Sequence, residues 1–359
     1  MDQNKIDALR AHLVPTRGHV IGGKFVPASD GGLMDILSPL DGQALTQVAR
    51  GTTAGMERAI ASARAAFNDG RWTGQPPAAR KKVLLEWADL IEANTLELAL
   101  LGVRDNGTEF STAIKAEPGL AAGTIRYYAE ALDKIYSEIA STPSDILGMI
   151  HKKLVGVVGV VGVVGVVGAI IPWNFPMMIG AWKLGPALAM GNSVVLKPGE
   201  TASLSLMRMV ELTQNLGFVD TARAEGGDVV LGRERILQET GGYFMEPTIV
   251  TCVTPDATLS QKKVFGPVLG VTASETDDDA VRIANATVYG LAGAVWRSSL
   301  SRAHKMVRAV RTGVMHVNTY GGADGTVPLG GVGQSGNGSE KSLHAIEKYV
   351  NLKTAWIKL

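Results

Sequence analysis

The spacing of apolar residues along the chain predicts alternating helices and short strands. Met56, Ile60, Ala63 and Phe67 recur at helical spacing, and the segment 79–94 repeats this pattern. Further helices are expected after Pro176 and over 121–139, 203–216, 274–286 and 301–311. Apolar runs predict a hairpin at 20–25 and strands over 193–196, 228–231, 268–272, 314–317 and 349–359.

The middle of the chain predicts an α/β fold. An apolar stretch precedes Pro176, a short helix follows, and the strand 193–196 comes next and ends at Lys197-Pro198. A strand, a helix and a strand with short connections form a βαβ unit, which requires parallel strands. We therefore expect a parallel sheet in this region.

The segment before this unit is unusual, because 29 residues between Lys153 and Lys183 carry no charge and Gly-Val-Val repeats four times. Its length suits a membrane span. However, glycine and valine are poor helix formers, and Pro172 and Pro176 interrupt the run. As a strand, a period of three places the glycines on alternating faces. We expect that only part of the run lies in a sheet and that no membrane is involved.

Composition narrows the possible partners of the 359-residue chain. Its formal net charge is +1, with no basic block, which argues against nucleic acid. A single cysteine excludes a disulfide framework and a cysteine-based zinc cluster. The first residues have no apolar segment of the kind that directs secretion. A reducing, cytoplasmic setting is the expectation.

Three candidate chemistries are weak. The glycines of Gly331-x-Gly333-x-x-Gly336 match a dinucleotide-binding fingerprint, but no strand leads into them, which favours a glycine-rich loop. The six histidines show no metal-binding spacing, so we expect no metal. Cys252 has no cation or base near it in sequence, which favours a half-buried cysteine over a reactive one.

The most informative residues surround the predicted βαβ unit. Asn174 follows the first strand, at the strand end where α/β sheets place ligand chemistry, and its amide can donate to a developing oxyanion. Lys197 and Glu200 follow the second strand, where they can hold ribose hydroxyls. A buried Trp173 beside a capped turn explains the same residues without any function.

Several segments together carry a resemblance to a known family. They are 168–176 and 191–200, then Phe-Met-Glu-Pro-Thr-Ile at 244–249, Val-Phe-Gly-Pro-Val at 264–268, Tyr-Gly-Leu-Ala at 289–292 and Leu-Gly-Gly at 329–331. In this order they resemble the NAD(P)-dependent aldehyde dehydrogenases, from about Val20 to the end. The segment 334–345 looks like the subgroup that oxidises ω-amino and γ-glutamylamino aldehydes.

The resemblance implies a fold and a set of site residues. Residues 1–220 would form a helical and Rossmann-like cofactor region, 221–320 a remnant of the catalytic domain, and 321–359 a loop and an oligomerisation strand. Asn174 would be the oxyanion donor. The residues implied for NAD or NADP binding are Ile170, Ile171, Pro172, Trp173, Lys197, Glu200 and Phe265.

The sequence also departs from the family. After 215–218 it passes almost directly to 222–227, which resembles a point well inside the catalytic domain. The glutamate base in Glu-Leu-Gly-Gly and the cysteine after Gly-Gln have no counterpart, and Lys263 replaces a ribose-binding glutamate.

Two hypotheses follow. One is an aldehyde dehydrogenase homologue that acts on an aminoaldehyde by descent but lacks the groups for turnover. The other is a non-catalytic protein that forms homo-oligomers or associates with full-length relatives.

Overall fold

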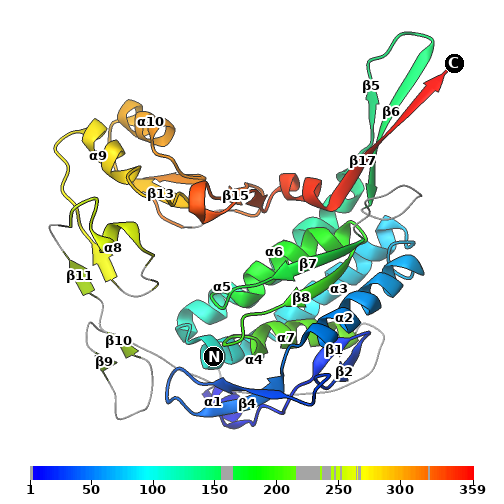
Figure 1. The fold of residues 1–359 in the computed structure, drawn as a ribbon, viewed down its shortest axis with the longest axis horizontal. Coiled ribbons are helices and arrows are strands. Elements are labelled where there is room, and N and C mark those ends of the chain that lie inside the picture. The colour runs from blue at the N-terminus through cyan, green and yellow to red at the C-terminus, as the bar shows by residue number, and fades with distance from the viewer. Residues whose placement is uncertain are drawn as a thin grey trace. The chain divides into compact units, whose positions relative to one another are not determined.

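The structure is a computed structural model that describes residues 3–154, 165–215, 235–236, 244–245, 248–250, 253–263, 265, 268–321 and 324–359. The chain divides into two compact units (Figure 1). Unit 1 holds residues 1–229, 239–243 and 346–359, and unit 2 holds 230–238 and 244–345.

Unit 1 is mixed α/β. Its helices are α1 (Gln3–Ala11), α2 (Thr53–Asn68), α3 (Pro77–Ala93), α4 (Thr95–Asn106), α5 (Phe110–Ala131), α6 (Pro176–Ala189) and α7 (Leu204–Glu211), with 3-10 turns η1 (Leu132–Lys134) and η2 (Leu212–Asn215). Its strands are β1 (His19–Ile21), β2 (Lys24–Val26), β3 (Leu33–Leu37), β4 (Ala44–Ala49), β5 (Glu138–Ala140), β6 (Ile146–Leu154), β7 (Val166–Ile170), β8 (Ser193–Lys197) and β17 (Val350–Lys358). The expected hairpin is present as the antiparallel pair β1–β2.

The predicted βαβ unit is confirmed. Strands β7 and β8 pair in parallel from Val166 opposite Ser193 to Ile170 opposite Lys197, and α6 connects them. The prediction of an α/β fold is correct. Most of the Gly-Val-Val repeat, residues 155–164, lies outside the described residues, as does the strand predicted at 228–231.

Helix α6 lies against α5 and α7 at unusually short distances. A Cβ added to Gly185 would lie 2.9 Å from Cδ2 of Tyr128 on α5, and one added to Gly180 would lie 2.7 Å from Cδ1 of Leu206 on α7. Glycine at these two positions therefore permits the packing. Tyr128 and Leu206 are themselves fully buried, which places the core of unit 1 between these helices.

The helix predicted over 121–139 has different bounds. It begins at Phe110, where the carboxylate of Glu109 accepts hydrogen bonds from the backbone N–H groups of Ser111 and Thr112, and it ends at Ala131. Its expected last turns form η1 and the strand β5. The prediction was wrong there, because Ile135, Tyr136 and Ile139 are residue types that favour extended backbone.

Strands β17, β6 and β5 form an antiparallel sheet in that order. The strand expected over 349–359 is present as β17, which pairs with β6 along nine residues from Val350 to Lys358. In Figure 1 this sheet extends away from the helices of unit 1.

Unit 2 consists of short elements. They are the strands β9 (Arg235–Ile236), β10 (Phe244–Met245), β11 (Thr248–Val250), β12 (Val268–Gly270), β13 (Ala292–Val295), β14 (Val314–Val317), β15 (Leu329–Gly330) and β16 (Ser339–Glu340), the helices α8 (Thr258–Gln261), α9 (Asp277–Ala284) and α10 (Leu300–Ala309), and the 3-10 turn η4 (Gly333–Ser335). The 3-10 turn η5 (Leu343–Tyr349) runs from unit 2 into unit 1. Pairs β11–β12 and β13–β14 are parallel.

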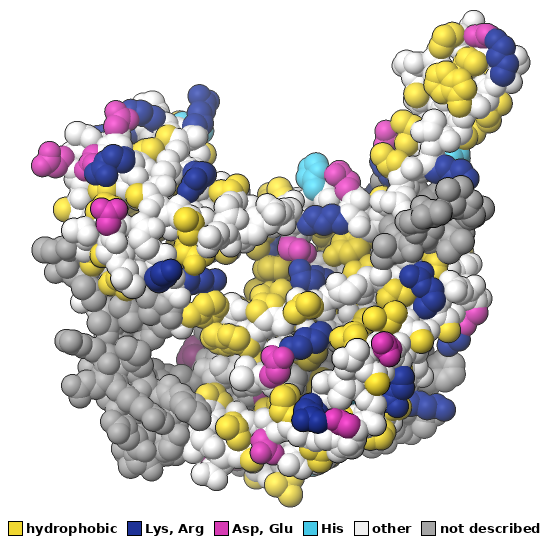
Figure 2. Space-filling view, viewed as in Figure 1, with side chains coloured by type: hydrophobic (Ala, Val, Ile, Leu, Met, Phe, Trp, Pro, Cys, Tyr) yellow, Lys and Arg dark blue, Asp and Glu magenta, His cyan; other side chains and the backbone are white. Residues whose placement is uncertain are grey.

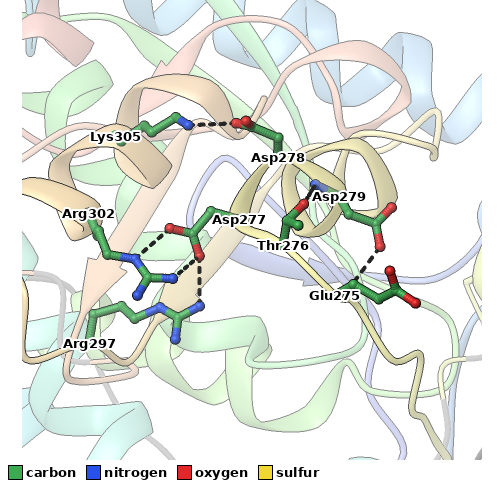
Figure 3. Close-up of polar contacts among 8 residues, drawn as sticks. All are labelled: Glu275, Thr276, Asp277, Asp278, Asp279, Arg297, Arg302 and Lys305. Atoms are coloured by element: carbon green, nitrogen blue, oxygen red, sulfur yellow. Dashed lines mark hydrogen bonds and ion pairs between the residues drawn. The ribbon is translucent and has the colours of Figure 1, made fainter.

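Helices α9 and α10 are joined by ion pairs (Figure 3). Asp277 at the start of α9 accepts hydrogen bonds from Arg302 at 2.6 Å and from Arg297 at 2.9 Å. Lys305 of α10 donates to Asp278 at 2.6 Å. Thr276 caps α9 through its hydroxyl, which accepts from the N–H of Asp279 at 3.0 Å.

Within the part of the chain that the structure describes, no helix is both long and apolar enough to cross a membrane.

Candidate functional site

The ends of β7 and β8 form one side of the candidate site. The ladder continues one residue past β7, where the N–H of Ile171 donates to the carbonyl of Lys197 at 2.9 Å. Ile171 is buried, whereas the side chain of Ile170 is 76% exposed. Alternation along the strand thus anchors one isoleucine in the core and presents the other to solvent.

Lys197, the last residue of β8, forms an ion pair with Glu200 in the loop that follows the strand. The side chain of Glu200 is exposed and that of Lys197 is half-exposed, and the hydrogen bond from Lys197 holds the pKa of Glu200 below its ordinary value. An exposed pair of this kind contributes little to folding. Little free energy is therefore lost when the ion pair opens and the two side chains bind hydroxyl groups of a ligand instead.

The loops after β7 and β8 touch at Gly199 and Trp173. A Cβ added to Gly199 would lie 3.1 Å from the backbone nitrogen of Trp173 and 3.3 Å from its Cα. The side chain of Trp173 is partly exposed rather than buried. This exposure removes the buried-tryptophan explanation that the sequence left open.

Asn174 lies in the bend between β7 and α6 and is half-buried, while Pro172 beside it is exposed. Phe175 follows in the left-handed conformation, with φ of 54°, and Pro176 begins the helix. A non-glycine residue in this conformation is uncommon and is typical of a constrained turn. The turn fixes where the backbone of Asn174 leaves the sheet.

Two buried carboxylates accept hydrogen bonds from the first turns of α6 and α7, the helices that follow these loops. They were not identified from the sequence. Glu117 of α5 accepts a hydrogen bond from the N–H of Met178 at 3.0 Å, and burial raises the pKa of Glu117 to about 7. Asp105 of α4 accepts from the N–H of Leu204 at 2.6 Å, and burial raises the pKa of Asp105 to about 8. Each carboxylate therefore occupies the N-terminus of a helix of the βαβ region.

Phe265 belongs to unit 2, unlike the other seven predicted site residues. Its φ is 55°, and Nζ of Lys263 lies 4.4 Å from the centre of its ring. This contact is a cation–π interaction.

The three weaker candidates from the sequence are the glycine motif at 331–336, Cys252 and a metal site. The glycines of 331–336 lie in the connection between β15 and β16. The expectation that no strand leads into them was wrong, because β15 ends at Gly330. The pair β15–β16 is antiparallel, however, so the segment is a glycine-rich loop and not part of a βαβ unit. Cys252 lies outside the described residues. Among the residues that are described, no group of three or more His, Cys, Asp or Glu side chains is arranged to hold a metal ion.

A model of the aldehyde dehydrogenase family matches residues 25–218 and 214–355 of the chain. The NADP/NAD-dependent aldehyde dehydrogenase PuuC of Escherichia coli is 32% identical over 479 aligned positions, which cover 94% of this chain and 95% of that protein.

Solved structures agree with this match. The γ-glutamyl-γ-aminobutyraldehyde dehydrogenase of Burkholderia cenocepacia has 30% identity and a TM-score of 0.88, with 99% of each chain covered. The indole-3-acetaldehyde dehydrogenase AldA of P. syringae, solved with NAD+ and IAA, has 31% identity and a TM-score of 0.88, also with 99% of each chain covered.

Proposed function

Since this chain belongs to the aldehyde dehydrogenase family, we propose that its β7–α6–β8 unit keeps the cofactor-facing part of an aldehyde-oxidising site, and that the chain alone does not turn over an aldehyde. The observation that carries the proposal is the contact between the loops after β7 and β8. It brings Trp173 and Asn174 to the same sheet end as Lys197 and Glu200.

Each retained residue has a defined part in the proposal. The amide of Asn174 donates a hydrogen bond to the oxygen of the reacting aldehyde as negative charge develops on it. Lys197 and Glu200 hold ribose hydroxyls, and Ile170, Pro172 and Trp173 form the apolar surface beside them. The side chain of Ile171 is buried, so it supports this surface from the core and does not itself face the cofactor. The nicotinamide of bound NAD or NADP supplies the hydride acceptor.

The adenosine end of NAD or NADP fits these residues, but the pyrophosphate does not. Pyrophosphate is commonly held by N–H groups at a helix N-terminus. In α6 and α7 the N–H groups of Met178 and Leu204 already donate to Glu117 and Asp105. Neither helix offers a phosphate site, so the proposal assigns that part of the cofactor to a segment that this chain lacks.

A missing block explains why turnover is not expected. The two matches to the family model meet at 214–218, and the alignment with PuuC runs over 479 positions although the chain has 359 residues. Both facts support a gap after η2. Aldehyde oxidation requires a thiol nucleophile and a base, which act as a unit, so loss of both removes most of the rate enhancement.

The substrate class in this proposal is an aldehyde with an amino or γ-glutamylamino group. Its support is the names of similar proteins, which include an aminoacetaldehyde dehydrogenase of Pseudomonas aeruginosa at 29% identity.

A titration tests the cofactor-facing part of the proposal. Fluorescence of the wild-type protein is followed with NAD+ and, separately, with AMP, and the Trp173→Phe variant isolates the signal of that residue. If only the adenosine end is held, both ligands bind with similar, weak affinity. Binding of NAD+ a hundredfold tighter than AMP would show a pyrophosphate site, and absence of binding by either ligand would refute the proposal.

The alternative function, non-catalytic assembly, is favoured by the sheet of β5, β6 and β17. Strand β17 is an edge strand, and its Leu352 and Trp356 are 66% and 63% exposed. Figure 2 shows hydrophobic side chains gathered on this sheet. A strand at the edge of a sheet, with exposed apolar residues, is suited to pairing with another chain through its outer edge.

Molar mass from size-exclusion chromatography with light scattering tests this alternative. The wild-type chain is expected to elute as an oligomer, and Leu352→Asp to elute at a lower mass. Lys353→Ser is the control, because the neighbouring residue points to the opposite face of β17. A monomer in the wild type, alone and with a full-length relative, would refute assembly.

A further inference from the structure

We propose that Glu117 is a positioning residue, whose buried carboxylate fixes the first turn of α6 and thereby the orientation of Trp173 and Asn174. The inference rests on the proposed function in one respect, because that function assigns the loop before α6 to the binding of the oxyanion. The positioning itself follows from contacts within unit 1.

Glu117 supplies the side-chain hydrogen-bond acceptor that the N-terminus of α6 lacks. Pro176 has no N–H, and the residue before it, Phe175, makes no side-chain capping bond. One carboxylate oxygen of Glu117 accepts from the N–H of Met178 at 3.0 Å and also from the N–H of Met177. These two donors lie three and four residues after Asn174, so they define the turn into which its loop leads.

Helix α6 is fixed by side chains at its other end as well. The indole of Trp72 donates to the carbonyl of Leu188 at 3.0 Å, and Nε of Arg80 donates to the carbonyl of Ala189 at 3.1 Å. A carboxylate at the N-terminus and a guanidinium at the C-terminus both match the helix dipole. With both ends held, the helix offers a rigid base for the loop before it.

The arrangement is costly for a purely structural cap. Serine or aspartate at the N-cap position would satisfy the same N–H groups without burying a long carboxylate. Here Glu117 is 1% exposed, its second oxygen has no hydrogen-bond partner among the residues that the structure describes, and Pro118 follows inside the same helix. Such departures from local rules concentrate at functional sites.

Asp105 provides a comparison within the same unit. It accepts from the N–H groups of Leu204 and Ser205 at the start of α7. The two carboxylates use the same chemistry, but only Glu117 caps the helix that Asn174 enters. Loss of Glu117 is therefore expected to move the loop that holds Asn174, whereas loss of Asp105 is not, although both carboxylates make the same kind of hydrogen bond.

The test is the indole N–H signal of Trp173 in ¹⁵N-tryptophan-labelled full-length protein, assigned with Trp173→Phe. Glu117→Ala is expected to shift this signal by more than its linewidth, and Glu117→Gln, which keeps an acceptor at the same reach, is expected to restore it. Glu109→Ala is the matched control, because Glu109 accepts from the N–H groups of Ser111 and Thr112 at the start of α5. This control is expected to leave the signal unchanged.

Should Glu117→Ala fail to fold, Glu117→Asp replaces it, since the shorter side chain keeps the charge and loses the reach. A wild-type signal in the Ala or Asp variant would overturn the proposal. A shift in Glu117→Gln as large as in that variant, or an equal shift in Glu109→Ala, would do the same. The measurement uses no cofactor, so a failure of NAD+ to bind counts against the proposed function and leaves this test intact.

Discussion

At the scale of single residues, the sequence predicted the positions of the candidate site residues that lie at or shortly after the end of a strand. Asn174, Lys197 and Glu200 follow predicted strands, and the paired ends of β7 and β8 bring them together. Glu117 and Asp105 were missed because both lie outside the predicted helices: Asp105 is in α4, and Glu117 is in the part of α5 that precedes residue 121. Their burial depends on packing between α4, α5, α6 and α7, which one helical pattern does not reveal.

The buried carboxylate of Asp105 predicts a pH-dependent stability. Because its pKa is about 8 in the folded chain and near 3.8 when exposed, the folded state binds more protons between these values. Stability therefore falls as pH rises through this window, and Glu117, with a pKa raised to about 7, acts in the same direction. Urea unfolding at several pH values measures the slope.

Asp105→Asn keeps an acceptor for the N–H of Leu204 and removes the titration. We expect it to reduce the slope by up to about 1.4 kcal/mol per pH unit. A wild-type stability that increases from pH 4 to 8, or an unchanged slope in the variant, would contradict this explanation.

The contact between Gly199 and Trp173 predicts that a side chain at position 199 disturbs the site. In Gly199→Val the new atoms meet the backbone of Trp173 at about 3.1 Å, and we expect a loss of about 1–3 kcal/mol together with altered Trp173 fluorescence. Gly168→Ala in β7 is the control, since a Cβ there meets nothing within 4 Å. Equal stability of the two variants would show that the loops are not in contact.

At the scale of elements, apolar residues at helical spacing and end signals such as Pro176 predicted most of the longer helices, whereas α1 and α4 were missed. Helices α2, α3, α9 and α10 each show apolar residues at helical spacing, and the sequence indicated all of them. Helix α4 was missed because an unbroken run of its residues from Leu98 to Val103 is buried. A helix that is apolar around its circumference shows no periodic signal.

The ion pairs between α9 and α10 predict unequal roles for two adjacent aspartates. Asp277 contacts both Arg297 and Arg302, whereas Asp278 contacts only Lys305 among the described residues and its side chain is 81% exposed. We expect Asp277→Asn to lower the midpoint of thermal unfolding more than Asp278→Asn. The difference should shrink in 1 M NaCl, because salt screens exposed charges. Identical midpoints at low salt would contradict it.

At the scale of the whole molecule, the order of elements was sufficient for the fold class. A strand, a helix and a strand with short connections required parallel pairing, and β7 and β8 pair in this way. The sequence predicted a domain boundary after residue 220, but it did not indicate that the far end of the chain returns to unit 1, where β17 pairs with β6. Contacts so distant in sequence leave no local pattern.

The central claim is that this member of the aldehyde dehydrogenase family keeps part of a cofactor site and lacks the groups for turnover. The most direct test is NADH formation, followed by absorbance with an ω-aminoaldehyde and NAD+ at saturating concentrations. The account predicts a rate indistinguishable from that of the enzyme-free mixture, and the same rate for Cys252→Ala. Robust turnover by the wild type that Cys252→Ala abolishes would contradict the account, because the nucleophile would then be present in this chain.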